Sequence, residues 1–248
     1  AIEDGSCQRS WAELSDRTIR IAHFLRDQAG LVPGDHVALL MDNRAEVVEL
    51  LHGAILAGLW VTPINWHLTE EEVAYVIEDS GARIVFSDER FGDTAERAVS
   101  PLAPGRSVSV LRAGPDLDAV LASASDAPFG SDEPAGGNMI YTSGTTGRPK
   151  GVKRVSLPSV GAALSHWRKY GRRVGLDGTG LHLVTGPMYH AAPLMFSIYD
   201  QSNGAPMLIM PRWEERQALR MIEEREVAHT HLVPTMFVRL LRLPEEER

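Results

Sequence analysis

The sequence has little of the features that mark secreted, membrane or nucleic-acid-binding proteins. It has one cysteine, Cys7, so no disulfide can form within the chain, and a reducing compartment such as the cytoplasm is expected. It has neither an apolar run long enough to cross a bilayer nor the basic start and apolar stretch of a signal peptide, so no transmembrane segment is predicted. Its formal net charge of -8 disfavours a broad nucleic-acid-binding surface.

The rest of the composition is that of a globular chain. Hydrophobic residues make up 44% of the 248 residues and charged residues 23%, which is enough apolar material for one large core or two small ones. The chain starts without methionine and stops abruptly at Arg248, from which we expect a trimmed chain, the front part of a longer protein.

Apolar residues alternate between strand-like runs and helical spacing along the chain. The expected strands cover 37–41, 83–87, 108–111, 138–141, 181–184, 206–210 and 229–233, and the expected helices cover 10–25, 43–55, 69–80, 214–225 and 235–243. Near-continuous apolar strands that alternate with helices are typical of a parallel sheet covered on both faces. The sequence therefore predicts an α/β fold in which layered parallel or mixed sheets are flanked by helices.

Residues 123–137 differ from their surroundings because they are small, polar and rich in turn formers, and we expect a surface connection there. The predicted organisation is a first α/β subdomain over 1–122, this connection, and the start of a second α/β subdomain over 138–248. The range 1–248 is then an incomplete domain, and its exposed sheet edges could favour a homo-oligomer.

The segment from Tyr141 to Gly151, YTSGTTGRPKG, carries hydroxyl side chains, glycines and a lysine directly after a predicted strand. Glycines let the backbone approach a ligand, and exposed amides form a concavity that binds anions. Hydroxyls donate to phosphate oxygens or join the shell of a metal ion, and Lys150 adds a positive charge. Pro149 before the lysine and Gly151 after it exclude the Walker loop. The segment predicts a polyphosphate site, and the alternative is an ordinary surface turn.

The same string resembles the signature loop of the adenylate-forming superfamily, which includes acyl-CoA synthetases, coumarate–CoA ligases, luciferases and the adenylation domains of peptide synthetases. Further blocks that resemble the family are found at 34–43, 53–58, 61–65, 187–193 and 230–236. The basic run after the loop is similar to that of fatty-acid–CoA ligase-like members. The resemblance implies an incomplete N-terminal AMP-binding domain with the acyl-CoA synthetase-like fold.

In this family a carboxylic acid and ATP give an acyl-adenylate and pyrophosphate, and the sulfur of CoA then displaces AMP. The resemblance implies that the loop binds the β- and γ-phosphates through Thr142, Ser143, Gly144, Thr145, Thr146, Gly147 and Lys150. Thr145 matches the position expected to approach Mg²⁺. ATP and Mg²⁺ are thus the expected ligands of this chain, and CoA is the expected co-substrate, bound largely outside it.

His190 matches a family residue near the carboxylate and the adenylate, and it is the catalytic candidate, which would position the acid and gate its pocket. The alternative is a structural histidine packed between a strand and a helix. Amino-acid-activating relatives usually have Phe-Asp where this chain has Tyr189-His190, so the expected substrate is a fatty or other apolar acid without an α-amino group. Residues 191–196 then either line an apolar acyl channel or form the ordinary core of a helix.

Other features limit what the chain can do. His229 and His231 share a predicted strand face without a visible third ligand, so core packing is favoured over a metal site. The family's Tyr-Gly-x-Thr-Glu and Thr-Gly-Asp motifs do not occur in these residues, and neither does the C-terminal domain with its catalytic lysine. Because groups that are not present cannot be positioned, we expect little or no ligase activity from this chain alone.

The expected function is therefore that of an acid–CoA ligase, with two alternatives. One is part of another adenylate-forming enzyme, such as a peptide-synthetase adenylation domain, which Tyr189-His190 argues against. The other is a truncated protein that binds nucleotide or acid without turnover.

Overall fold

The computed structural model of the chain describes residues 1–102, 107–142, 148–153 and 157–247. The chain divides into two compact units with separate sheets. Unit 1 comprises residues 1–11, 43–45 and 164–248, and unit 2 comprises residues 12–42 and 46–163. The subdomain boundary predicted at 123–137 stays a prediction.

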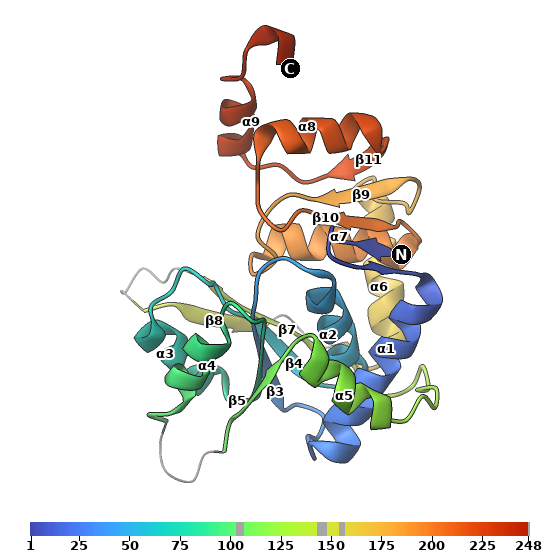
Figure 1. Cartoon of the computed structure of the whole chain (residues 1–248). Helices are drawn as coiled ribbons and strands as arrows, with labels where there is room; N and C mark the ends of the chain where they lie inside the picture. The colour runs from blue at the N-terminus through green and yellow to red at the C-terminus, as the bar shows by residue number, and fades with distance from the viewer. Residues whose placement is uncertain (103–106, 143–147, 154–156, 248) are drawn as a thin grey trace. The chain divides into compact units, whose positions relative to one another are not determined.

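The helices and strands of the described residues are labelled in chain order in Figure 1. The helices are α1 (Trp11–His23), α2 (Ala45–Leu56), α3 (Glu70–Ser80), α4 (Gly92–Val99), α5 (Pro115–Ser123), α6 (Val160–Arg173), α7 (Ala191–Asn203), α8 (Glu215–Glu224) and α9 (Pro234–Leu240), with a π-helical turn at Phe24–Gln28 and a 3-10 turn at Glu245–Glu247. The strands are β1 (Ile2–Glu3), β2 (Gln8–Arg9), β3 (His36–Leu40), β4 (Trp60–Pro63), β5 (Ala82–Ser87), β6 (Ser109–Arg112), β7 (Gly137–Thr142), β8 (Lys150–Lys153), β9 (Leu181–Val184), β10 (Met207–Ile209) and β11 (Val227–Thr230). None of the helices in these ranges is long and apolar enough to span a membrane.

The sheet of unit 2 is mixed. Its strand order over the described residues is β6-β5-β3-β4-β7-β8. Neighbouring strands run parallel from β6 to β7, and β8 runs antiparallel to β7. Every residue of β3 is buried, as expected for a central strand that is covered on both faces. The predicted α/β class with mixed sheets is confirmed, and the structure adds β8, which the sequence analysis did not predict.

Helix α3 of unit 2 is fixed at both ends and along its inner face. Thr69 Oγ1 accepts a hydrogen bond from the N–H of Glu72, and the Glu72 carboxylate accepts one from the N–H of Thr69, which forms a capping box. Gly81 ends the helix in the left-handed conformation at a φ of 77°. Between these ends Val73 and Val76 are buried in a core cluster shared with α4, which lies beside α3 in Figure 1.

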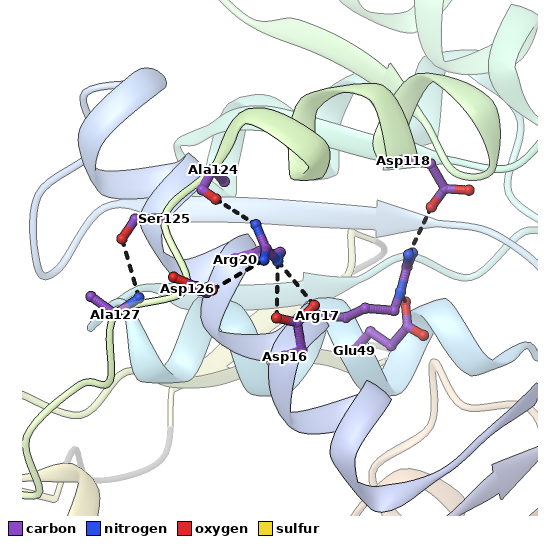
Figure 2. A network of polar contacts seen from close by, with 9 residues as sticks. All are labelled: Asp16, Arg17, Arg20, Glu49, Asp118, Ala124, Ser125, Asp126 and Ala127. Carbon is purple, nitrogen blue, oxygen red and sulfur yellow. Dashed lines mark hydrogen bonds and ion pairs between the residues drawn. The ribbon is translucent and has the colours of Figure 1, made fainter.

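Two arginines of α1 make polar contacts in unit 2, and one of them, Arg20, holds the start of the predicted surface connection (Figure 2). Arg20 donates a hydrogen bond to the carbonyl oxygen of Ala124 at 2.7 Å and forms an ion pair with Asp126 at 3.4 Å. One turn earlier, Arg17 forms an ion pair of 2.7 Å with the fully buried carboxylate of Glu49 on α2. The connection is therefore attached to α1 by Arg20, which lies more than 100 positions away in the sequence, and Arg17 joins α1 to α2.

The sheet of unit 1 is also mixed. Its described strands follow the order β11-β9-β10-β1-β2, in which only the β1–β2 pair is antiparallel. β9 has the predicted bounds, whereas β11 lies earlier in the chain than the predicted strand 229–233. The residue before a proline is restricted and Pro234 has no N–H, so the chain leaves the ladder and Pro234 begins α9.

Asp200 of α7 joins two strands of unit 1. Its fully buried carboxylate lies 2.9 Å from Nδ1 of His182 on β9 and 2.8 Å from Nδ1 of His229 on β11, and it accepts a hydrogen bond of 3.0 Å from the N–H of Gly178. A carboxylate is stable in the interior only when its oxygen atoms are paired, as they are here. Among the described residues no group of three or more His, Cys, Asp or Glu side chains is arranged to hold a metal ion.

His36, the first residue of β3, is a buried histidine in unit 2. It has 7% of its surface exposed, and its ring stacks on that of Trp60 at a centroid distance of 6.2 Å. The ammonium group of Lys153 lies 5.0 Å from the centre of the Trp60 ring. Burial, and then the positive charge of Lys153, lower the pKa of His36 from 6.5 to about 4. The folded protein therefore holds His36 as a neutral imidazole at neutral pH.

Replacement of Asp200 tests the buried contact in unit 1. Asp200→Ala leaves the Nδ1 atoms of His182 and His229 and the N–H of Gly178 without their acceptor, so we expect the free energy of unfolding to fall by about 3 kcal/mol or more. Urea unfolding followed by circular dichroism measures the loss. Asp132→Ala, which removes an exposed carboxylate, is the control and should change the free energy of unfolding by less than about 0.5 kcal/mol. Equal effects of the two substitutions would contradict the prediction.

The lowered pKa of His36 predicts an acid-sensitive contribution to stability. The unfolded chain binds a proton at this residue near pH 6.5 and the folded chain near pH 4, so the contribution is complete above pH 6.5 and disappears as the pH falls to 4. The total is about 3 kcal/mol. We expect wild type to lose more unfolding free energy than His36→Leu between pH 7 and pH 4, measured by urea unfolding. His67→Leu, at an exposed histidine, should follow wild type; parallel curves for wild type and His36→Leu would refute the assignment.

Candidate functional site

The predicted phosphate loop connects β7 and β8 of unit 2. The antiparallel register places Thr142, the last residue of β7, opposite Lys150, the first residue of β8. Both side chains are exposed. The other predicted members of the loop, Ser143, Gly144, Thr145, Thr146 and Gly147, lie outside the described residues.

The paired ends of the hairpin have the chemistry of an anion site. A hydroxyl group donates one hydrogen bond, and an ammonium group adds three donors and a full positive charge. Thr142 and Lys150 bring these groups to paired positions at the end of the ladder that leads into the loop. The structure thus brings together two of the predicted site residues that are separated in the sequence.

Helix α3 contacts both stems of this loop. The hydroxyl of Tyr141, next to Thr142, donates to the carboxylate of Asp79 at 2.6 Å. On the other stem the hydroxyl of Tyr75 donates to the carbonyl oxygen of Pro149 at 3.2 Å, and the guanidinium of Arg148 lies 5.1 Å from the centre of the Tyr75 ring. No local motif in the sequence indicates Tyr75 or Asp79, because they lie 74 and 62 positions from their partners.

The second candidate, His190, belongs to unit 1 and is the N-cap residue of α7. Its side chain is exposed and makes no cap hydrogen bond, and its ring lies 4.5 Å from that of Tyr189. Partial removal from water lowers the pKa of His190, and burial raises the pKa of Tyr189. Both side chains are therefore neutral at neutral pH. The alternative interpretation was a structural histidine packed between a strand and a helix. The ring of His190 is instead exposed at the start of a helix.

Asn43 fixes the segment that leads to His190. Its side chain is 3% exposed and makes three hydrogen bonds to the backbone of unit 1. The amide nitrogen donates to the carbonyl oxygens of Gly186 at 2.8 Å and Met210 at 3.1 Å, and the amide oxygen accepts from the N–H of Met188 at 2.8 Å. One buried amide thus joins the segments that follow β9 and β10. The sequence predicts Asn43 only as the start of a helix, and no local pattern indicates this second role.

The residues after His190 form the first turns of α7. Leu194 is fully buried and Met195 is 7% exposed, whereas Ala191, Ala192 and Phe196 are half-buried. Full burial of some residues beside half-buried neighbours is typical of a helix that packs one face against a core. It supports the interpretation of Leu194 and Met195 as helix core, and the acyl channel stays a prediction.

Comparison with known proteins adds the family. The family model described as AMP-binding enzyme matches residues 1–248. A fatty acid–[acyl-carrier-protein] ligase, ScoC of Streptomyces coeruleorubidus, is 32% identical over 95% of this chain and 45% of its own length. A 2-succinylbenzoate–CoA ligase of Geobacillus kaustophilus is 31% identical over 97% of this chain and 46% of its own length. The chain thus spans about half the length of the curated relatives that it matches.

Solved structures show the same fold. The inhibitor-bound N-terminal domain of FACL13 from Mycobacterium tuberculosis superposes with a TM-score of 0.83 at 25% identity, over 100% of this chain and 62% of that one. ATP-bound MatB from Rhodopseudomonas palustris superposes with a TM-score of 0.78 at 28% identity, over 98% of this chain and 48% of that one. The predicted N-terminal acyl-CoA synthetase-like fold is confirmed.

The three hydrogen bonds of Asn43 predict a strong dependence of stability on this side chain. Asn43→Ala leaves the N–H of Met188 and two carbonyl oxygens buried without partners, so we expect a loss of about 2–4 kcal/mol in the free energy of unfolding. Asn65→Ala is the matched control, because Asn65 is half-buried and its side chain accepts one bond, from the N–H of His67. Urea unfolding compares the two variants. If Asn43→Ala lost no more unfolding free energy than Asn65→Ala, the prediction would be wrong.

Proposed function

The chain belongs to the AMP-binding enzyme family, and we propose that it carries the ATP-binding part of an acid–CoA ligase. In the proposed reaction a carboxylate oxygen of the acid attacks the α-phosphorus of ATP and pyrophosphate leaves. The thiol sulfur of CoA then attacks the acyl carbon and AMP leaves. The observation that supports this proposal is the register pairing of Thr142 with Lys150 at the two ends of the family's signature loop.

The loop is proposed to bind the β- and γ-phosphates of ATP. Thr142 and Lys150 supply a hydroxyl donor and a cation from opposite strands, and their exposure leaves both groups accessible to an anion. The remaining proposed contacts are Ser143, Gly144, Thr145, Thr146 and Gly147. Donors held around the leaving pyrophosphate stabilise the negative charge that grows on it as the α–β bond breaks.

Mg²⁺, when bound with ATP, neutralises part of the triphosphate charge. Thr145 is the proposed residue nearest to the ion, through its hydroxyl oxygen. The hydroxyl oxygen fits this assignment because hydroxyls can join the shell of a metal ion, and the phosphate oxygens of ATP would supply further ligands. No step in the proposal depends on further protein ligands for Mg²⁺.

His190 is proposed to position the carboxylate of the acid. Because its lowered pKa keeps the ring neutral, it offers one N–H donor to a carboxylate oxygen without forming a tight ion pair. A neutral imidazole at this place also offers no counter-charge to an ammonium group, unlike the aspartate of amino-acid-activating relatives. The proposed substrate class is therefore a fatty or other apolar acid, and a peptide-synthetase-type substrate is disfavoured.

The acceptor of the acyl group has a second candidate. CoA is the proposed acceptor, in line with the relatives that are CoA ligases. A relative of similar identity is named as a ligase that acts with an acyl carrier protein, whose thiol is the alternative acceptor. Thioester formation by the full gene product with CoA and with a carrier protein, offered in parallel, distinguishes them.

The remaining expectations are also proposals. The 248 residues contain neither the Tyr-Gly-x-Thr-Glu nor the Thr-Gly-Asp motif, so nucleotide binding without efficient thioester formation is proposed for this chain by itself. A truncated protein that binds nucleotide or acid without turnover would behave in the same way. The activity of the full gene product distinguishes this alternative from part of an acid–CoA ligase. The single cysteine supports a reducing compartment such as the cytoplasm. Self-association through the sheet edges stays a prediction.

Calorimetric titration of the 248-residue chain with MgATP, pyrophosphate and AMP tests the phosphate assignment. We expect Lys150→Met to weaken MgATP and pyrophosphate about tenfold, because it removes a charged donor to the phosphates. Thr142→Val, which keeps the shape of the side chain, should weaken them about threefold. AMP has no β- or γ-phosphate, so its affinity should not change.

Lys169→Met provides the control, since it removes an exposed lysine of α6. It should bind all three ligands as wild type does. A wild-type chain that binds neither MgATP nor pyrophosphate, or a Lys150→Met variant that binds both with unchanged affinity, would overturn the assignment.

A further inference from the structure

We propose that Tyr75 and Asp79 of α3 are positioning residues that clamp the two stems of the phosphate loop and thereby set its affinity for a triphosphate. The proposal rests on the proposed function of the loop. It concerns described residues of unit 2 alone: α3, the end of β7, and the start of β8. We refer to the contacts of Tyr75 and Asp79 with the stems as the stem clamp.

The stem clamp makes one contact to each stem from one face of one helix. Tyr75 and Asp79 are four residues apart on α3, so their side chains are neighbours on its surface. Asp79 accepts the hydroxyl proton of Tyr141 on the incoming stem, and Tyr75 donates to the carbonyl oxygen of Pro149 on the outgoing stem. A single rigid element therefore fixes the spacing between the two ends of the loop.

The contact of Asp79 with Tyr141 is a strong one. The distance of 2.6 Å is that of a charge-assisted hydrogen bond from a hydroxyl to a carboxylate. Burial, and then this bond, raise the pKa of Tyr141 above its usual range, so the hydroxyl remains a donor at all physiological pH values. Asp79 lies in the last turn of α3, where the helix dipole disfavours a carboxylate. The contact with Tyr141 offsets that local cost.

The contact of Tyr75 controls the outgoing stem at two consecutive residues. Its ring packs on the core cluster of α3, and its hydroxyl reaches Pro149. The guanidinium of Arg148 lies over the same ring at 5.1 Å, within the range of a cation–π contact. Arg148 and Pro149 immediately precede Lys150, so the position of Lys150 follows from that of Tyr75.

The pleat of β7 explains how the clamp leaves the phosphate donors accessible. Successive side chains of a strand point to opposite faces, so a Tyr141 side chain directed to α3 leaves that of Thr142 on the other face. A Cβ atom at Gly151, the register partner of Tyr141, would lie 2.0 Å from Cε of Met139 and 3.0 Å from Cζ of Tyr141. Glycine at this position therefore leaves room for the Met139 side chain and for the clamped ring.

The stem clamp acts on affinity through preorganisation. Because α3 is held by its capping box and by buried Val73 and Val76, the stems are fixed before a ligand arrives. Without the clamp, binding must also order the stems, and that ordering reduces affinity. The loss falls on ligands that contact the loop through β- and γ-phosphates, and not on AMP.

The test is calorimetric titration of the 248-residue chain with MgATP, pyrophosphate and AMP, using Tyr141→Phe and Asp79→Asn. Each variant should weaken MgATP and pyrophosphate by about five- to tenfold and leave AMP unchanged. The double variant should lose no more than the larger single loss, because Tyr141→Phe removes, and Asp79→Asn weakens, the same hydrogen bond. Tyr75→Phe should add a separate loss of about threefold. Asp79→Glu, which keeps the carboxylate, should restore part of the affinity lost in Asp79→Asn.

Glu78→Gln is the matched control, since it removes the adjacent exposed carboxylate of α3 and should change no affinity. Thermal unfolding of each variant checks that the fold is kept. Wild type that does not bind MgATP or pyrophosphate would overturn the proposed function and the stem clamp with it. Wild type that binds both, with unchanged affinities in Tyr141→Phe and Asp79→Asn, would overturn the stem clamp alone. Equal losses for AMP and MgATP would also overturn it, because they indicate only a structural role.

Discussion

The antiparallel pairing of β8 with β7 is the constraint on which the candidate phosphate site depends. Five strands of unit 2 run parallel among the described residues, and parallel strands need a long crossover before the chain returns. β8 instead returns directly beside β7. Only this reversal brings Thr142 and Lys150 into register, so a hydroxyl and an ammonium group from the two ends of the loop occupy paired positions.

Polar side chains add contacts between segments to the hydrogen bonds of the strand ladders. Asn43 joins the segments after β9 and β10, and Asp200 joins β9 to β11 in unit 1. Asp79 does the same for the end of β7 in unit 2, although from an exposed position. Asn43 does so through backbone groups, whereas Asp200 and Asp79 do so through the side chains of strand residues. A side chain of this kind costs little conformational entropy to order, and its loss leaves polar groups unpaired.

The sequence predicts the elements whose signals are local. β9 is found at its predicted bounds because the short, mostly apolar run of a central strand is a clear local signal. α3 follows from the capping box of Thr69 and Glu72 at its start. β8 was missed because an edge strand with mostly exposed residues, KGVK, has no apolar period. The anchors Asn43, Asp79 and Tyr75 were missed for another reason. Each contacts residues more than 60 positions away, and no local pattern encodes such a partner.

The same limit applies to the loop residues themselves. Their chemistry was visible in the sequence as hydroxyls, glycines and a lysine, because composition over a short window is enough to indicate phosphate binding. The position of Thr142 opposite Lys150 was not, because it depends on the pairing of β7 with β8. Ser143 to Gly147 lie outside the described residues, so their roles still rest on family resemblance.

Both candidate regions follow the carboxyl ends of parallel strands in their own sheets. The phosphate loop follows β7, which pairs in parallel with β4, and His190 lies six residues after β9, which pairs in parallel with β10. In open α/β sheets ligands bind beyond these ends, because the loops there are free of the constraints that the sheet core imposes. The placement of polar, ligand-suited side chains at this edge in each unit is therefore what the topology favours. Neighbouring buried positions, such as Leu194 on the helix that follows His190, serve packing instead.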